Sequence, residues 1–155
     1  MIERVYNLPI SQSERTLIVC PIPREYSTSG PIREFRKLFP IDYMLMAKGM
    51  KPRTKDSGND PNIIHELGSY FLTDFGEQKI CWICIHSADH NKYNMDVIED
   101  IIKAMAEDGL HHEFDMAFPL LGSYEVDGVD DYDVGLLIEH FFGDTDQMID
   151  IHVDY

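Results

Sequence analysis

Two segments of the sequence combine glycine, small hydroxyl residues and the expected start of a helix. The first is "PIPREYSTSGP" at residues 21–31, and the second is "LGSYEVDGVDD" at residues 121–131. Backbone N–H groups in such turns and at helix starts can hold phosphate oxygens. Neither segment is a P-loop or a G-x-G-x-x-G, so phosphate binding is one interpretation and a plain connection is the other.

The cysteines and the first histidines have simpler structural interpretations. Cys81 and Cys84 form a C-x-x-C inside the apolar run "KICWICIH". Residues i and i+3 of a strand face opposite sides of a sheet, so this spacing predicts core cysteines rather than a redox or zinc pair. His86, Asp89 and His90 follow the same run without a further well-spaced ligand, which does not favour a metal site.

A second pair of histidines, His111 and His112, follows the expected end of a helix. A cation there interacts favourably with the helix dipole, and this is the role we assign to them. The sequence contains no Ser-His-Asp or nucleophile-elbow pattern, and we assign no metal and no cofactor from the sequence.

The elements around these segments alternate between strands and helices. Residues 16–20, "TLIVC", are typical of a strand buried on both faces, and "MIDIHVDY" alternates like an edge strand. The predicted order is strand, helix, hairpin, helix, strand, helix, strand, with residues 51–61 as a flexible insertion. This order predicts one domain over residues 1–155, an α/β three-layer sandwich with a mixed sheet. In such sheets ligands bind where strands lead into helices.

The charge distribution restricts the class of protein. The net charge is −15, and residues 89–155 carry 2 Lys/Arg against 18 Asp/Glu. This surface argues against general nucleic-acid binding and favours a solvated acidic face. No apolar run reaches the length of a spanning helix, and the N-terminus lacks a signal-peptide core. Three cysteines do not make a disulfide framework, so we expect a cytoplasmic protein with no membrane contact.

Two longer stretches carry a family resemblance. Residues 20–39, "CPIPREYSTSGPIREFRKLF", align without a gap with a loop of the type M-G-A-G-I-A and a helix ending F-K-K-K-F. Residues 118–134, "FPLLGSYEVDGVDDYDV", follow the pattern P-x-I-G-x-G-L with one inserted residue. On these motifs the chain resembles the macro domain family, most closely the branch of ADP-ribose-1″-phosphate phosphatases and the terminal ADP-ribose protein glycohydrolase.

This resemblance implies a binding site for ADP-ribose. Asn7 takes the place of the acidic residue that holds adenine, and the two loops take the places that clamp the diphosphate and the distal ribose. Asp127 matches the catalytic aspartate, and His86 stands in the place of the catalytic lysine. The implied ligand-binding residues are Asn7, Ser27, Thr28, Ser29, Gly30, Gly122, Ser123, Tyr124, Glu125, Val126 and Gly128.

Some residues depart from the family pattern. Thr28 and Tyr124 stand where the family has glycine, and each side chain narrows the space for a phosphate against the backbone. His86 cannot form the Schiff base of a lysine, but it can act as a general base or polarise the ribose. Asp127 would then orient His86 or activate water.

Two functions therefore remain open. The first is a domain that binds ADP-ribose or an ADP-ribosylated protein, with hydrolysis of terminal ADP-ribosyl esters or of ADP-ribose-1″-phosphate. The second is a catalytically inactive macro-like module that sequesters a nucleotide or binds a protein partner through its acidic C-terminal half.

Overall fold

A six-stranded mixed sheet forms the centre of the computed structural model, which describes residues 1–6, 8–22, 32–47, 51–54, 58–60, 68–85, 95–119 and 131–153. The strand order is β1-β8-β7-β2-β6-β5, and only β5 runs antiparallel to its neighbour. The strands are β1 (Ile2–Tyr6), β2 (Leu17–Pro21), β5 (Tyr70–Phe75), β6 (Gln78–Ile83), β7 (Met116–Phe118) and β8 (Ile149–Val153).

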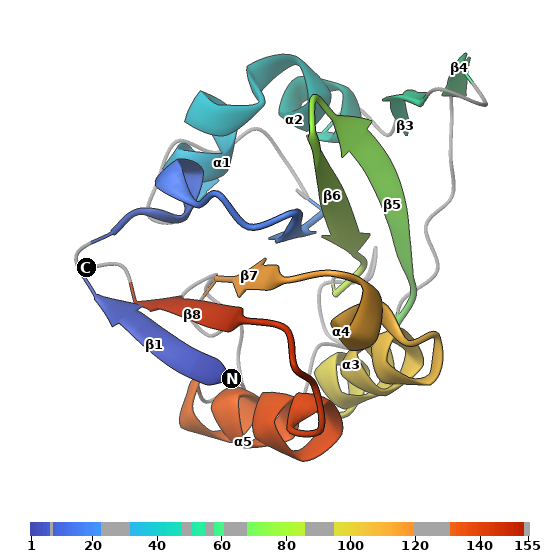
Figure 1. Ribbon diagram of the computed structural model, residues 1–155. Helices are drawn as coiled ribbons and strands as arrows, with labels where there is room; N and C mark the ends of the chain where they lie inside the picture. The colour runs from blue at the N-terminus through green and yellow to red at the C-terminus, as the bar shows by residue number, and fades with distance from the viewer. Residues whose placement is uncertain are drawn as a thin grey trace.

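Helices cover both faces of this sheet, which confirms the predicted three-layer sandwich (Figure 1). The short helix η1 (Ile10–Gln12), α1 (Ile32–Leu38) and α2 (Pro40–Ala47) lie on one face. On the other face lie α3 (Met95–Glu107), α4 (Leu110–Glu113) and α5 (Asp131–Phe142).

Strand β2 contributes side chains to the hydrophobic core on each face of the sheet, because successive side chains of a strand point to opposite faces. Ile18 and Cys20 pack with the α1 and α2 side, whereas Leu17 and Val19 pack with the α3 and α5 side. All five residues of β2 are buried, as the apolar run predicts for a strand covered on both faces.

In the sequence, apolar residues recur at helical spacing from Met95 to Met105 and Gly109 is the expected stop, and helix α3 follows this prediction. Ile98, Ile101, Ile102 and Met105 are its buried residues and recur at helical spacing. Gly109 follows with φ of 74°, a left-handed conformation that favours glycine and separates α3 from α4.

Strand β8 lies inside the sheet, so its prediction as an edge strand is wrong. It pairs with both β1 and β7, and all five of its residues are buried. The polar members of its alternating pattern have partners: Asp150 accepts hydrogen bonds from Arg15, and His152 lies 2.9 Å from the Leu8 carbonyl oxygen. The alternation therefore reflects two buried polar side chains with specific partners rather than a solvent-facing side.

Within the expected flexible insertion at residues 51–61, the described residues form two short strands. β3 (Lys51–Thr54) and β4 (Gly58–Asp60) pair as a two-stranded antiparallel sheet. Across the described ranges, no helix is both long enough and apolar enough to cross a membrane.

Candidate functional site

Five parallel strands bring several chain segments to one edge of the sheet, which we call the carboxyl edge. β1, β8, β7, β2 and β6 all run in the same direction. The register aligns Tyr6 with Val153 at one end of this row and Pro21 with Ile83 at the other. Segments that leave these strands therefore start side by side, where ligands of open α/β sheets bind.

The residues implied by the family resemblance are attached to this carboxyl edge. Asn7 follows the last residue of β1, and His86 comes shortly after β6. The first loop lies between β2 and α1, and the second lies between β7 and α5. These candidates all fall outside the described residues, namely Asn7, Ser27, Thr28, Ser29, Gly30, His86, Gly122, Ser123, Tyr124, Glu125, Val126, Asp127 and Gly128.

The anchors of the second loop are firmly packed. Phe118 at the end of β7 is buried and contacts Phe142 of α5, with ring centroids 5.9 Å apart. Val134 and Ile138 of α5 belong to the same core cluster as Phe118. The strand before the second loop and the helix after it thus belong to one packed core.

One basic side chain lies close to α5. A Cβ at Gly135 would come within 2.7 Å of the Arg4 guanidinium, so the glycine leaves room for this cation. Arg4 therefore places a positive charge beside the helix that follows the acidic second loop.

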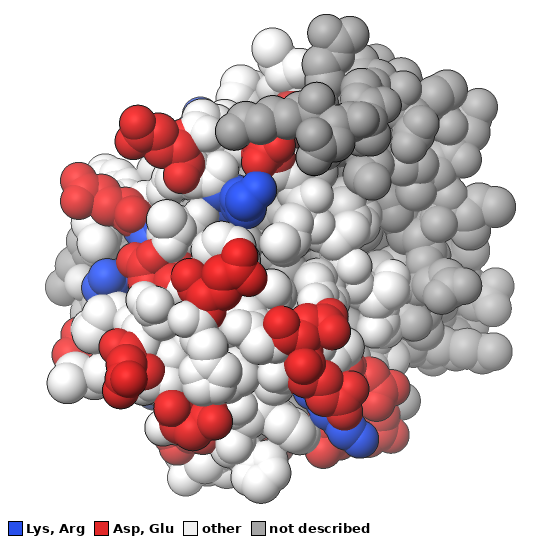
Figure 2. Space-filling view, turned by 45° about the vertical axis from the view of Figure 1, so that its right-hand side comes forward, with Lys and Arg blue, Asp and Glu red and all other residues white. Residues whose placement is uncertain are grey.

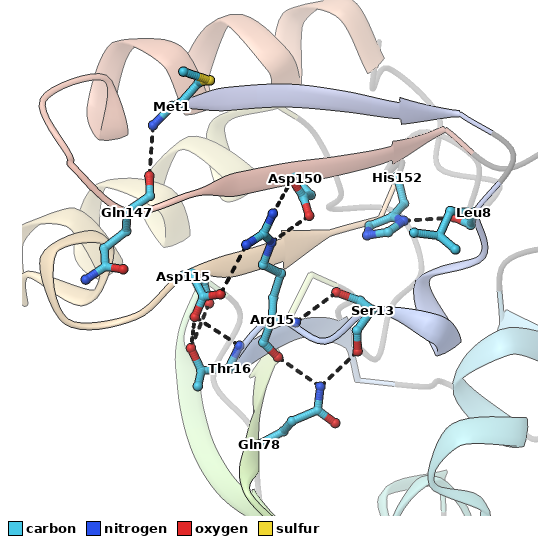
Figure 3. Close-up of polar contacts among 10 residues, drawn as sticks. All are labelled: Met1, Leu8, Ser13, Arg15, Thr16, Gln78, Asp115, Gln147, Asp150 and His152. Carbon is cyan, nitrogen blue, oxygen red and sulfur yellow. Dashed lines mark hydrogen bonds and ion pairs between the residues drawn. The ribbon is translucent and has the colours of Figure 1, made fainter.

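A buried histidine holds the segment that follows Asn7. His152 on β8 is 1 % exposed, and its Nδ1 lies 2.9 Å from the Leu8 carbonyl oxygen (Figure 3). Because a carbonyl oxygen only accepts, the Nδ1 carries the proton in this contact. The bond ties the chain just beyond β1 to the neighbouring strand.

At the opposite edge, which we call the amino edge, an ion-pair network joins the starts of three strands (Figure 3). Arg15 precedes β2 and donates from Nε to Asp150 Oδ2 of β8 at 2.7 Å. It also contacts Asp115, which precedes β7, at 3.4 Å. The hydrogen bond from Arg15 to Asp150 raises the pKa of the guanidinium, although burial lowers it. The sequence showed these residues only as ordinary charges, because they are far apart in the chain.

The cysteines are structural, as their spacing predicts. All three are free and buried, and Cys81 and Cys20 lie on adjacent strands. Burial raises the pKa of both thiols, which disfavours the reactive thiolate.

Sequence reasoning missed a side-chain cluster at the amino edge. His111 and His112 of α4 lie against Asp144, which precedes β8. The local pattern showed two histidines after a helix, but it could not place Asp144, which is 33 residues from His111. The vicinal histidines were the only local signal available in the sequence.

Comparisons of the sequence alone found no relative: no protein-family model matches the chain, and no curated protein matches it significantly. Comparison of the structure was informative. The macrodomain of Mycobacterium tuberculosis DarG superposes with a TM-score of 0.72 at 14% identity, covering 100% of this chain and 99% of that one. The macrodomain of Thermus aquaticus DarG superposes with a TM-score of 0.70 at 14% identity, covering 99% and 98%.

A third solved structure, Thermosipho africanus DarTG in complex with ADP-ribose, has a TM-score of 0.63 at 14% identity. It matches 92% of this chain, which spans 39% of that longer one. Together with the mixed sheet and its two helical layers, these similarities establish that the chain has the macrodomain fold. Its assignment to one branch of macro domains remains the prediction made from the loop motifs.

Proposed function

We propose that this protein binds ADP-ribose, or an ADP-ribosyl group on a protein, across the two loops at the carboxyl edge. The observation that carries the proposal is the convergence of β1, β2, β6 and β7, whose carboxyl ends lead into all the residues implied by the family motifs. The complex of Thermosipho africanus DarTG with ADP-ribose supports this choice of ligand for the fold.

A calorimetric titration of the purified protein with ADP-ribose tests the proposal. We expect saturable binding of one ADP-ribose per chain. AMP alone should bind more weakly because it lacks the distal ribose and one phosphate. Absence of heat at high protein concentration would refute the ligand assignment.

Tyr124 provides a sharper test of the second loop, because it stands where the family motif has glycine. If the side chain occupies ligand space, Tyr124→Gly raises the affinity for ADP-ribose. If the ring contacts the ligand, the same variant lowers the affinity. Tyr132→Ala is the control for loss of a tyrosine, because Tyr132 is 66% exposed. Alanine is used there because glycine would perturb helix α5.

Hydrolysis is the finer part of the proposal. Asp127 would activate or orient water, and His86 would act as a general base or polarise the distal ribose. We expect release of ADP-ribose from an ester-linked ADP-ribosylated protein, or of phosphate from ADP-ribose-1″-phosphate. Asp127→Ala and His86→Ala should each lower turnover by about 10²–10⁴-fold. Exposed Asp146→Ala and His140→Ala are matched controls and should retain turnover.

If the protein shows no hydrolysis, its acidic surface favours the alternative function, a catalytically inactive module that binds a protein partner. Figure 2 shows acidic side chains spread over the described part of one face, with few basic side chains among them. This charge suits a basic protein partner, and its attraction should weaken as salt rises. Binding of ADP-ribose without turnover would identify a binding module rather than an enzyme.

A further inference from the structure

Three potential metal ligands converge at the amino edge, which is opposite the carboxyl edge where we propose that ADP-ribose binds. His111 and His112 belong to α4, which leads into β7. Asp144 belongs to the connection between α5 and β8. Because β7 and β8 are parallel neighbours, the segments before them meet at the same edge.

The distances suit a single ion. Asp144 Oδ1 lies 3.0 Å from His111 Nε2, and Asp144 Oδ2 lies 3.5 Å from His112 Nε2. The candidate ligand atoms of the three residues all lie within 4.8 Å of one another. Zinc bonds of about 2.0–2.1 Å in a tetrahedron place neighbouring ligand atoms roughly 3.3 Å apart, a value between the two measured contacts.

The surroundings hold this cluster in place. The His111 side chain is 4% exposed and packs on the Phe142 ring at 5.0 Å between centroids. The Thr145 hydroxyl donates to the His111 carbonyl oxygen, and the Gln147 side chain donates to the His112 carbonyl oxygen at 3.3 Å. These bonds tie the Asp144 connection to α4 independently of any ion.

The two remaining side chains face solvent. His112 is 53% exposed and Asp144 is 70% exposed, so water can reach the cluster and complete the coordination of an ion. An exposed aspartate carboxyl is ionised at neutral pH, so it is available as a ligand.

We propose that His111, His112 and Asp144 bind a divalent zinc ion. Two imidazoles and a carboxylate are a common donor set for zinc when a fourth position is left to water. The ion would cross-link α4 to the connection before β8, and so stabilise the starts of β7 and β8. This site does not depend on the proposed ADP-ribose function.

One feature sets the expected affinity. Metal binding through Nε2 of His111 leaves the ring proton on Nδ1, which is buried and has no hydrogen-bond partner among the described residues. Metal-ligating histidines usually donate this proton, and losing such a contact weakens binding about 10–100-fold. We therefore expect an affinity well below that of a structural zinc site with four ligands.

The test is zinc titration of the full chain, purified without a histidine tag, followed by calorimetry and by thermal unfolding. The wild-type protein should bind one zinc ion at this site and unfold at a higher temperature when zinc is bound. Asp144→Asn and His112→Gln should each weaken zinc binding at least tenfold. Both side chains are exposed, so these variants should fold.

Asp146→Asn and His140→Gln are controls, because both residues are exposed and lie outside the cluster. They should bind zinc as the wild-type protein does. The proposal fails if wild-type protein does not bind zinc at millimolar concentration, or if Asp144→Asn and His112→Gln bind it unchanged. It also fails if zinc binding is abolished only by His86→Ala, which would place the ion at the carboxyl edge.

Discussion

Arg15 offers a direct test of how the amino edge supports the strands that carry the proposed site. It joins Asp150 of β8 with Asp115 before β7 and is itself placed just before β2. Arg15→Met removes the guanidinium but keeps most of the aliphatic stem. Asp150, which is 7% exposed, would then remain buried without its cation.

The expected cost follows from the burial of this pair. Removing one partner of a fully buried ion pair costs about 3–5 kcal/mol. The Arg15 side chain is 29% exposed, so water screens part of the interaction. We therefore expect Arg15→Met to lower the free energy of unfolding by about 2–3 kcal/mol.

Urea unfolding followed by fluorescence of Trp82 is a suitable assay, because this is the single tryptophan and it is fully buried. With a denaturant slope of about 1–3 kcal/mol/M, the midpoint should fall by about 0.7–3 M. Lys79→Met is the control, since it breaks a more exposed pair with Asp74 and should cost less than about 1 kcal/mol.

A double-mutant cycle separates the ion pair from simple loss of packing. Asp150→Asn leaves a neutral amide, so adding Arg15→Met should cost less than in the wild-type background. We expect a coupling free energy of about 1–3 kcal/mol. Additive effects of the two substitutions, or a cost of Arg15→Met no greater than that of Lys79→Met, would contradict this role of the ion pair.

Three further predictions test other parts of the fold by the same assay. Thr73→Val removes the acceptor of the Trp82 indole N–H, at 2.8 Å, and should cost about 1–3 kcal/mol; an unchanged midpoint would contradict this. Gly109→Ala should cost about 1–2 kcal/mol because φ is 74°, although nothing lies within 4 Å of the added Cβ; a gain in stability would contradict this. Desolvation raises the pKa of the Asp115 carboxyl, but hydrogen bonds from Thr16 lower this pKa overall in the folded protein. The ionised carboxylate therefore contributes its full stabilisation above the ordinary pKa of 3.8. This contribution disappears as pH falls through the lower pKa of the folded state. Asp115→Asn should therefore lose less stability than the wild-type protein between about pH 5 and pH 2, and parallel losses would disprove this.

Local patterns in the sequence determined most of the elements. The stripe of Ile98, Ile101, Ile102 and Met105 predicted α3, and Gly109 predicted where that helix stops. The β5–β6 hairpin and the buried strand β2 were also predicted. These features could be recognised because hydrophobic periodicity depends only on neighbours in the chain.

The sequence also determined which segments follow which strands, and so it located the anchors of the proposed ADP-ribose site. The parallel arrangement of β1, β7, β2 and β6 confirms that these anchors share one edge. The roles of Asn7, His86, Asp127 and the two loops remain predictions from the family motifs.

Only the tertiary structure decided which strands are neighbours and which distant side chains meet. The alternating pattern of β8 predicts an edge strand from the sequence alone. In the structure its Asp150 carboxylate is buried and is paired with Arg15, which is 135 residues away in the chain. In the same way, the connection before β8 brought Asp144 to His111 and His112. Burial of a polar side chain depends on its partners in space, and these are set by strand order and register rather than by local spacing.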